Sequence, residues 1–126
     1  MPFVPQDPDF EARVRRSFAL QRVMETIGAR LARVAPGEVD VELAFRDDLT
    51  QQNGFLHAGI VSTVLDSACG YAAFTLMPAD AAVLSIEFKV NLLAPAQGER
   101  IIVRGRVVRA GRTISVCSGD AFAVRD

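Results

Sequence analysis

The stretch HAGIVSTVLDSACGYAAFTLMPAD, residues 57–80, decides the fold of this chain. Its side chains are apolar or small all around a helical projection and Pro78 closes it, so we expect one long helix over residues 58–76, enclosed by other elements. Asp66 is the only carboxylate between the two ends of the stretch, and no Lys or Arg accompanies it. Because an unpartnered buried carboxylate is costly, we expect Asp66 to be buried, hydrogen-bonded and chemically active.

Alternating apolar and polar residues predict strands on both sides of this helix. Residues 29–35 and 38–46 precede it, separated by a turn signal, and residues 84–92, 100–109 and 113–124 follow it, the last two joined by a hairpin turn at residues 110–111. Strands linked in this way form an antiparallel sheet, and a helix that is apolar on all sides needs a sheet curved around it. We therefore predict an α+β fold in which a curved antiparallel sheet wraps around the long central helix.

The first 28 residues are predicted to form an arm and a helix ahead of the sheet. Prolines at positions 2, 5 and 8 favour an extended arm. Apolar residues at helical spacing from Phe10 to Ile27 predict one amphipathic helix, or two short ones broken near Ser17, with Gly28 at the end. Since no linker or repeat interrupts the chain, we expect a single domain over residues 1–126.

Composition narrows the classes of function. The 126 residues are 50% hydrophobic and 23% charged with a formal net charge of −1, which indicates a globular protein without the basic face that nucleic acid requires. The basic runs at residues 13–16 and 104–112 are interpreted as solvated faces of a helix and a strand. The N-terminus lacks a signal-peptide pattern and the apolar stretch contains Asp66 and glycines, so we expect a cytoplasmic protein without a membrane span. One His and two Cys without Cys-x-x-Cys spacing argue against a metal site and for free thiols.

The run TQQNGFLHAGIVSTVLDSA, residues 50–68, resembles the signature of the hotdog-fold acyl-CoA thioesterases, in particular the PaaI-like (phenylacetic acid degradation) branch. The matching positions are Gly54, His57, Gly59 and Asp66, then Ser85, Pro95, Gly111 and Thr113 further along. Two positions depart from the family: Gln51 stands where Asn is common, and Ala58 replaces the first Gly after the His. The resemblance implies a hotdog fold and hydrolysis of an acyl-CoA thioester to a free acid and coenzyme A without metal or other cofactor. It also implies an obligate homodimer, often assembled into a homotetramer.

The spacing of His57 and Asp66 sets a constraint of its own. Nine positions along a helix correspond to about 13 Å of rise and roughly 900° of rotation, so the two side chains point to opposite sides. One thioester carbonyl cannot contact both residues on the same helix. If both serve one reaction, the active site lies at a two-fold interface, where the helix start of one chain meets Asp66 of the other.

The expected catalytic roles follow from where charge develops. Attack on a thioester places negative charge on the carbonyl oxygen, and free N–H groups at a helix start stabilise it, so Ala58 N–H, aided by Gly59, is the expected oxyanion donor. The side-chain amide of Gln51, or that of Asn53, is a further candidate donor. Asp66 would either activate a water as general base or attack the carbonyl directly.

Two more residues are expected to position these groups. Ser85 would orient Asp66 or the attacking water, and His57 would orient the loop or the thioester. Substrate contacts are expected from neighbours of the site, with Asn91 and two arginines facing the coenzyme A phosphates: Asn53, Gly54, Phe55, Leu56, Val61, Leu65, Asn91, Arg109 and Arg112. The identity of the acyl group is left open, and the loop geometry near Phe74, Leu76 and Met77, together with the N-terminal helix, would select it.

Other readings of the same residues stay open. Asp66 could be a structural acid, His57 a helix cap, and Ser85 a residue on a solvated face, while Gly70 is expected to allow close packing of helix on sheet. At the level of function, the alternatives are an acyl-CoA or acyl-carrier binding module without turnover and a hotdog dehydratase. The dehydratase is less favoured because those enzymes place the His and the acid differently.

Overall fold

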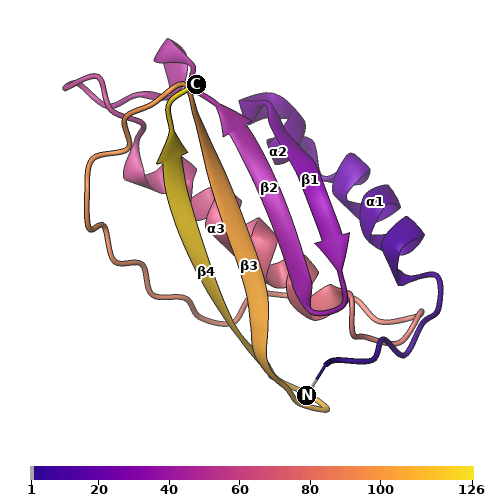
Figure 1. Cartoon of the computed structure of the whole chain (residues 1–126). Coiled ribbons are helices and arrows are strands. Elements are labelled where there is room, and N and C mark those ends of the chain that lie inside the picture. Colours follow the sequence, from indigo (N-terminus) through magenta and orange to yellow (C-terminus); the bar gives the residue numbers. More distant parts are fainter. Residues whose placement is uncertain (1) are drawn as a thin grey trace.

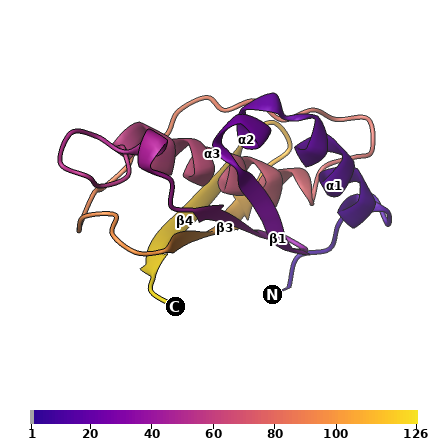
Figure 2. The ribbon, with the colours of Figure 1, turned by 90° about the horizontal axis from the view of Figure 1, so that it is seen from above.

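The computed structural model describes residues 2–126, in which three α-helices lie on one face of a four-stranded sheet (Figure 1, Figure 2). The helices are α1 (Phe10–Leu20), α2 (Arg22–Ile27) and α3 (Ala58–Phe74), with one 3₁₀ turn, η1 (Asp47–Leu49). The strands are β1 (Ala29–Ala35), β2 (Glu38–Ala44), β3 (Arg100–Ala110) and β4 (Ser115–Val124). Their order in the sheet is β1-β2-β3-β4 and each neighbouring pair is antiparallel, which confirms the predicted α+β fold.

The core forms between the inner face of the sheet and α3. Val39, Val41 and Leu43 alternate along β2 with no exposed surface, because side chains two apart on a strand share a face. The helix comes closest to the sheet at Gly105 of β3, where an added Cβ would lie 2.5 Å from the backbone of Ala68. A side chain at position 105 would therefore push the helix and the sheet apart.

The N-terminal helices cover a second side of α3. The chain breaks between α1 and α2 at Gln21, whose extended backbone separates them, and not at Ser17 as expected. Ser17 instead shares a hydrogen bond with the hydroxyl of Tyr71 at 3.1 Å, and the Gln21 amide donates to Ser67 at 3.1 Å. Gly28 ends α2 with a φ of 79°, a left-handed conformation that favours glycine, as predicted.

Arg13 corrects the interpretation of residues 13–16 as a solvated face. Its side chain is buried against the end of α3, 4.4 Å from the centre of the Phe74 ring. The guanidinium donates to the carbonyl oxygens of Phe74 at 2.7 Å and Met77 at 2.9 Å and pairs with Asp7 at 3.5 Å. These carbonyls lie at and just beyond the C-terminal end of α3, where the helix supplies no N–H donor for them, so the guanidinium is stabilised in the interior by donating to them. The helix itself ends at Phe74, two residues before the predicted end.

The expected strand at residues 84–92 is wrong. Residues 81–99 contain no strand, and the chain passes beside β4 as an extended segment without pairing with it (Figure 1). Burial does not follow the alternating pattern here: residues 84–89 are all exposed, including Leu84 at 88%, Ile86 at 78% and Phe88 at 60% exposure. Alternation predicts which residues share a side of an extended chain, but a strand also needs a neighbour to accept its backbone hydrogen bonds. We call residues 82–96 the strap.

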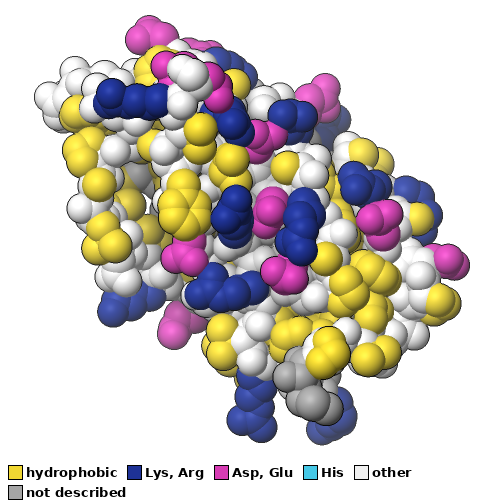
Figure 3. Space-filling model, in the orientation of Figure 1, with side chains coloured by type: hydrophobic (Ala, Val, Ile, Leu, Met, Phe, Trp, Pro, Cys, Tyr) yellow, Lys and Arg dark blue, Asp and Glu magenta, His cyan; other side chains and the backbone are white. Residues whose placement is uncertain are grey.

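The outer face of the sheet carries mixed charge (Figure 3). Its arginines pair with acids on neighbouring strands, as in Arg100 with Glu42 and Arg106 with Asp120. The face over β2 and β3 is therefore a mosaic of both signs and not a single basic patch. Among residues 2–126, no helix has the length and apolar character to cross a membrane.

Candidate active site

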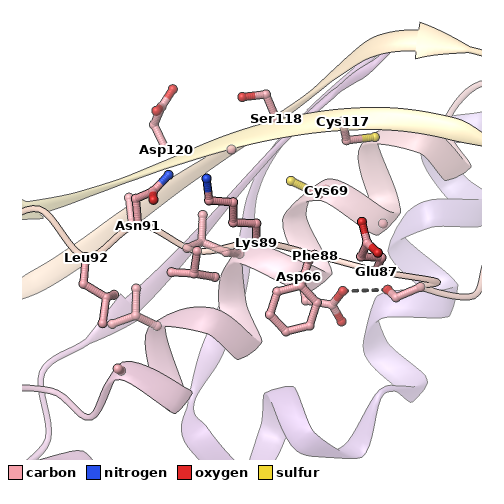
Figure 4. A pocket seen from close by; sticks show the side chains of 18 of the residues that line it. Asp66, Cys69, Glu87, Phe88, Lys89, Asn91, Leu92, Cys117, Ser118 and Asp120 are labelled. Atoms are coloured by element: carbon pink, nitrogen blue, oxygen red, sulfur yellow. Dashed lines mark hydrogen bonds between the residues drawn. The ribbon is translucent and has the colours of Figure 1, made fainter.

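A cleft of about 1580 Å³ separates the strap from α3 and β4. One long side of α3 forms its floor, from Ala58 at the helix start to Ala73 near the helix end. Figure 4 shows the middle of this cleft, with Glu87, Lys89 and Asn91 directed from the strap toward β4.

Asp66 lies halfway along this side of the helix. The hydroxyl of Ser85 on the strap donates to Oδ1 of Asp66 at 2.6 Å, and this hydrogen bond is the dashed line in Figure 4. Asp66 is partly exposed to the cleft and not enclosed as expected, because the strap leaves the helix uncovered here. It forms no salt bridge with any residue in 2–126. One carboxylate oxygen is therefore fixed by Ser85, and the other is free to face a ligand or a water.

The start of α3 presents one unused backbone donor. His57 is the N-cap, and its Nδ1 accepts the N–H of Gly59 at 2.8 Å, while its carbonyl accepts from Ile60 and Val61. Gly59 N–H is thus already paired. In the part of the chain that the structure describes, Ala58 N–H has no acceptor, as the first positions of a helix often lack one. Ala58 lines the cleft and Gly59 does not.

The loop before the helix is held by its own backbone and by Gln51. Gln51 accepts from Gly54 N–H through its backbone carbonyl at 3.0 Å, and its Oε1 accepts from Asn53 N–H at 2.5 Å. Gly54 has a φ of 87°, which a side chain would disfavour. With Oε1 engaged in the loop, the NH₂ group of Gln51 remains available at the cleft wall.

The cleft gathers most of the residues proposed from the sequence. Its lining includes nine members of the predicted catalytic and substrate-binding set: Gln51, Phe55, Leu56, His57, Ala58, Leu65, Asp66, Ser85 and Asn91. It also includes Val61. Five others lie outside the lining: Asn53, Gly54, Gly59, Arg109 and Arg112. Arg109 is exposed near the end of β3 and Arg112 in the turn that follows it, so the chain does not direct them at this cleft.

Comparison with known proteins decides the family. Residues 53–126 match the thioesterase superfamily. The chain belongs to this family. The crystal structure of a thioesterase family protein from Silicibacter pomeroyi is 58% identical, with a TM-score of 0.91 over 92% of this chain and 85% of that one. Human acyl-coenzyme A thioesterase 13 is 29% identical over 91 residues, which are 71% of this chain and 64% of that protein.

More distant structures show the same fold. The PaaI protein of E. coli is 13% identical, with a TM-score of 0.82 over 90% of this chain and 80% of that one. The predicted hotdog fold and thioesterase family are confirmed, and the chain is a thioester hydrolase. It spans about two thirds of the length of the curated relatives that it matches.

Among the residues expected to select the acyl group, Met77 lines the thioesterase cleft, whereas Phe74 and Leu76 are buried outside its lining. Sequence reasoning missed the residues of α3 that line this cleft beyond Asp66. Cys69, Gly70 and Ala73 line it at positions three, four and seven after Asp66, which is the spacing of one helix face. That spacing was the available signal. Gly70 does not touch the sheet: nothing lies within 4 Å of where its Cβ would be, so the expectation that it allows close packing is wrong. The packing glycines are Gly105 and Gly119 on the strands.

Both cysteines of the chain border this part of the cleft as free thiols. Burial, together with the nearby Cys117 and Asp66, raises the pKa of Cys69 to about 11. Burial also raises the pKa of Cys117. Both groups are therefore neutral near pH 7, and they behave there as small apolar side chains.

Proposed function

We propose that this thioesterase hydrolyses an acyl-CoA to the free acid and coenzyme A, with Asp66 as the group that activates water. The hydrogen bond between Ser85 and Asp66 at the centre of the cleft is the observation that carries the proposal. Because Ser85 donates its only proton to Oδ1, its oxygen can accept from a water that also faces the free carboxylate oxygen. The similarity to human acyl-coenzyme A thioesterase 13 supports coenzyme A as the thiol.

The reaction needs two proton transfers and the exchange of a carbon–sulfur bond for a carbon–oxygen bond. Asp66 takes a proton from water as the water oxygen bonds to the carbonyl carbon. The carbon–sulfur bond then breaks. The coenzyme A thiolate leaves and recovers the proton. A water held by both Ser85 and Asp66 favours a general base, and attack by Asp66 itself would give a mixed anhydride instead. No step requires a metal, so we expect enzyme dialysed against EDTA to keep its activity.

The oxyanion donor in this proposal is the Ala58 N–H. It is the unpaired backbone donor at the helix start and it lines the cleft, whereas Gly59 N–H is held by His57. The NH₂ group of Gln51 is the second donor. Within one chain, however, the Ala58 N–H and Asp66 are about 12 Å apart along the helix axis, too far to contact a single carbonyl group.

We therefore propose that the working site combines two copies of the chain, with Ala58 of one copy facing Asp66 of the other. The exposed apolar side of the strap supports this, since Leu84, Ile86 and Phe88 would be covered by a second copy. A dimer would contain two such sites, and two dimers could assemble into a tetramer.

Two substitutions test the roles of the groups. Asp66→Asn should lower kcat by about 10²–10⁴-fold, the usual contribution of a general base. Ala58→Pro replaces the N–H with a ring carbon, and the backbone tolerates it: position 58 is the first residue of the helix, and His57 already has the φ of −61° and ψ of 137° that a residue before proline prefers. It should cost about 10²–10³-fold in kcat, while the control Ala58→Gly keeps the N–H and the activity.

A hybrid dimer tests whether the site is shared. Copies carrying Asp66→Asn and Ala58→Pro are co-expressed with different tags, and dimers containing one of each are isolated. A shared site predicts that one of the two sites is intact, so activity returns to about half of wild type. A hybrid as inactive as its parents would show that each site lies within one chain. Tight binding of acyl-CoA without any release of thiol would instead favour a binding module.

A further inference from the structure

Gly70 is an unexplained glycine in the interior of α3. Among common residues only proline is less favourable than glycine inside a helix, so its presence there needs a reason. The glycines on the sheet have one: an added Cβ at Gly105 would lie 2.5 Å from the backbone of Ala68, and one at Gly119 would lie 2.9 Å from Sγ of Cys69. At Gly70 nothing lies within 4 Å of the Cβ position, and its φ is not in the left-handed region. Packing within the chain therefore does not account for it.

The empty space around Gly70 belongs to the cleft. Gly70 is four positions after Asp66, so the two residues are neighbours on the same face of the helix, about 6 Å apart. Anything that passes from Asp66 toward the end of the helix must cross the surface of Gly70. A larger side chain there would project into this passage.

The cleft beyond Gly70 suits an uncharged group. It is lined by small or apolar side chains of α3, the strap, β4 and the residues next to these elements: Cys69, Ala73, Met77, Val83, Ile114 and Cys117. Raised pKa values keep the two thiols neutral. The charged strap residues Glu87 and Lys89 follow Ser85 in the chain. They line the same cleft as His57 and Gln51 near the start of α3. None of the lining residues between positions 69 and 83 is charged, whereas the lining that follows Ser85 in the chain combines Glu87 and Lys89 with apolar residues such as Phe88 and Leu92 (Figure 4).

We propose that the acyl group of the substrate lies in the apolar end of the cleft and that Gly70 sets the length of acyl group the enzyme accepts. The proposal rests on the function proposed above, because it takes Asp66 as the position of the reacting carbonyl. The part of the cleft toward the start of α3, which contains the charged strap residues, then receives the coenzyme A side of the thioester. A glycine at position 70 leaves the passage at its widest.

The test is a graded series of side chains at position 70 assayed against acyl-CoAs of increasing length. Gly70→Ala, Gly70→Val and Gly70→Leu are compared with wild type on substrates from acetyl-CoA to dodecanoyl-CoA, and kcat and KM are separated for each. The longest acyl group hydrolysed efficiently should shorten as the side chain grows. For that substrate, kcat/KM should fall about 10–100-fold in Gly70→Leu, against less than about 3-fold for acetyl-CoA. Thr63→Val is the matched control, since Thr63 is on the same helix but outside the cleft lining.

Three other outcomes would overturn the proposal in different ways. An equal loss for all chain lengths would show that position 70 supports the helix or the site and does not select the acyl group. Loss of activity together with a changed mass in light scattering would show that a second copy of the chain fills the space at Gly70. If the wild-type enzyme releases no thiol from any acyl-CoA, the proposed function fails, and this inference fails with it.

Discussion

Helix α3 has two sides that differ in how far their side chains and backbone groups are buried and hydrogen-bonded. One side packs inside the protein, and the other lines the cleft. On the packed side, Val64, Ala68 and Ala72 have no exposed surface, and the carbonyls at the helix end are bound by Arg13. On the cleft side, Asp66 has a single hydrogen-bond partner and Gly70 has empty space around it. The same 17-residue helix thus has one face whose groups are buried or paired within the chain and one face whose groups are free to contact a ligand.

This difference separates stability from function within one element. Groups on the packed side contribute to folding because each is hydrogen-bonded or closely packed. Removing a hydrogen-bond partner leaves a buried polar group unpaired, and enlarging a packed side chain creates a clash. Groups on the cleft side contribute little to folding and are available for a ligand. Substitutions on the two sides should therefore affect different measurements, which the following predictions test.

Arg13→Met should have the largest effect on stability. It leaves Asp7 and the carbonyls of Phe74 and Met77 without their partner, and removing one member of a buried ion pair typically costs about 3–5 kcal/mol. Urea unfolding followed by circular dichroism gives the free energy of unfolding. Arg15→Met is the control, because Arg15 is exposed and only 3.8 Å from an exposed Glu11, a pair worth less than about 1 kcal/mol. Similar losses in the two variants would contradict the assignment of Arg13 as a clamp.

Gly105→Ala should destabilise the protein by about 1–3 kcal/mol or more. The new Cβ would meet the backbone of Ala68 at 2.5 Å, and a backbone segment inside a packed core cannot move aside cheaply. The shift in the urea midpoint measures the effect. A neutral result would mean that α3 and β3 are farther apart than the structure places them.

His57→Ala should cost about 1 kcal/mol, since it removes the side-chain acceptor for the Gly59 N–H at the start of α3. His57→Asn can restore such a cap and should recover most of the stability. Thermal unfolding of the two variants, set beside their rates of thioester hydrolysis, separates capping from catalysis. If His57→Asn regains stability but not activity, the imidazole also takes part in the reaction.

Gly70→Ala should stabilise the protein by about 0.5–1 kcal/mol, the opposite sign to Gly105→Ala. Alanine is the better helix former, and the open space at position 70 means that its methyl group meets no obstacle in the chain. The pair of variants, measured in one urea series, is the most direct test of the contrast between the two faces. A destabilised Gly70→Ala would show that something packs on this glycine.

At neutral pH, where the thiol is protonated in both the folded and the unfolded chain, the smallest effect on the fold is expected from the ionisation of Cys69. Its pKa is raised from near 9 to about 11 mainly by burial, so its thiolate is disfavoured in the folded protein. A raised pKa contributes stability that is complete below about pH 9 and is lost as the pH rises through about 11. In a Cys117→Ser background, alkylation by iodoacetamide, followed by mass spectrometry, should accelerate near pH 11. Acceleration near pH 9 would show a solvated thiol.

Several features were predictable from local patterns. The apolar stretch after His57 predicted α3 to within two residues, and alternation predicted β2, β3 and β4. The left-handed Gly28 and the pairing of Ser85 with Asp66 also agree with expectation. These features depend on the periodicity of a helix or strand, or on a known sequence motif. Both are determined by residues that are close together in the sequence.

Other features depended on which elements meet in space. A run of arginines gives no sign that Arg13 turns inward, because the helix end it binds is more than 60 positions away. The alternating strap has the composition of a strand but no partner within the described chain, so composition alone could not decide its structure. The sequence alone does not distinguish Gly70 from Gly105. Only the positions of their neighbours show that Gly105 is in close contact with α3, whereas Gly70 borders open space.

The amino-acid sequence by itself determined the central helix, most of the sheet, the thioesterase family and the acid at the middle of the helix, because periodicity and motif are local properties of the chain. Only the tertiary structure decided which side of that helix stays open, which backbone donor at its start is unpaired, and which residues line the cleft beyond Gly70. Those properties depend on packing and hydrogen bonds between residues far apart in the sequence, and they are also the ones that give the site its chemistry.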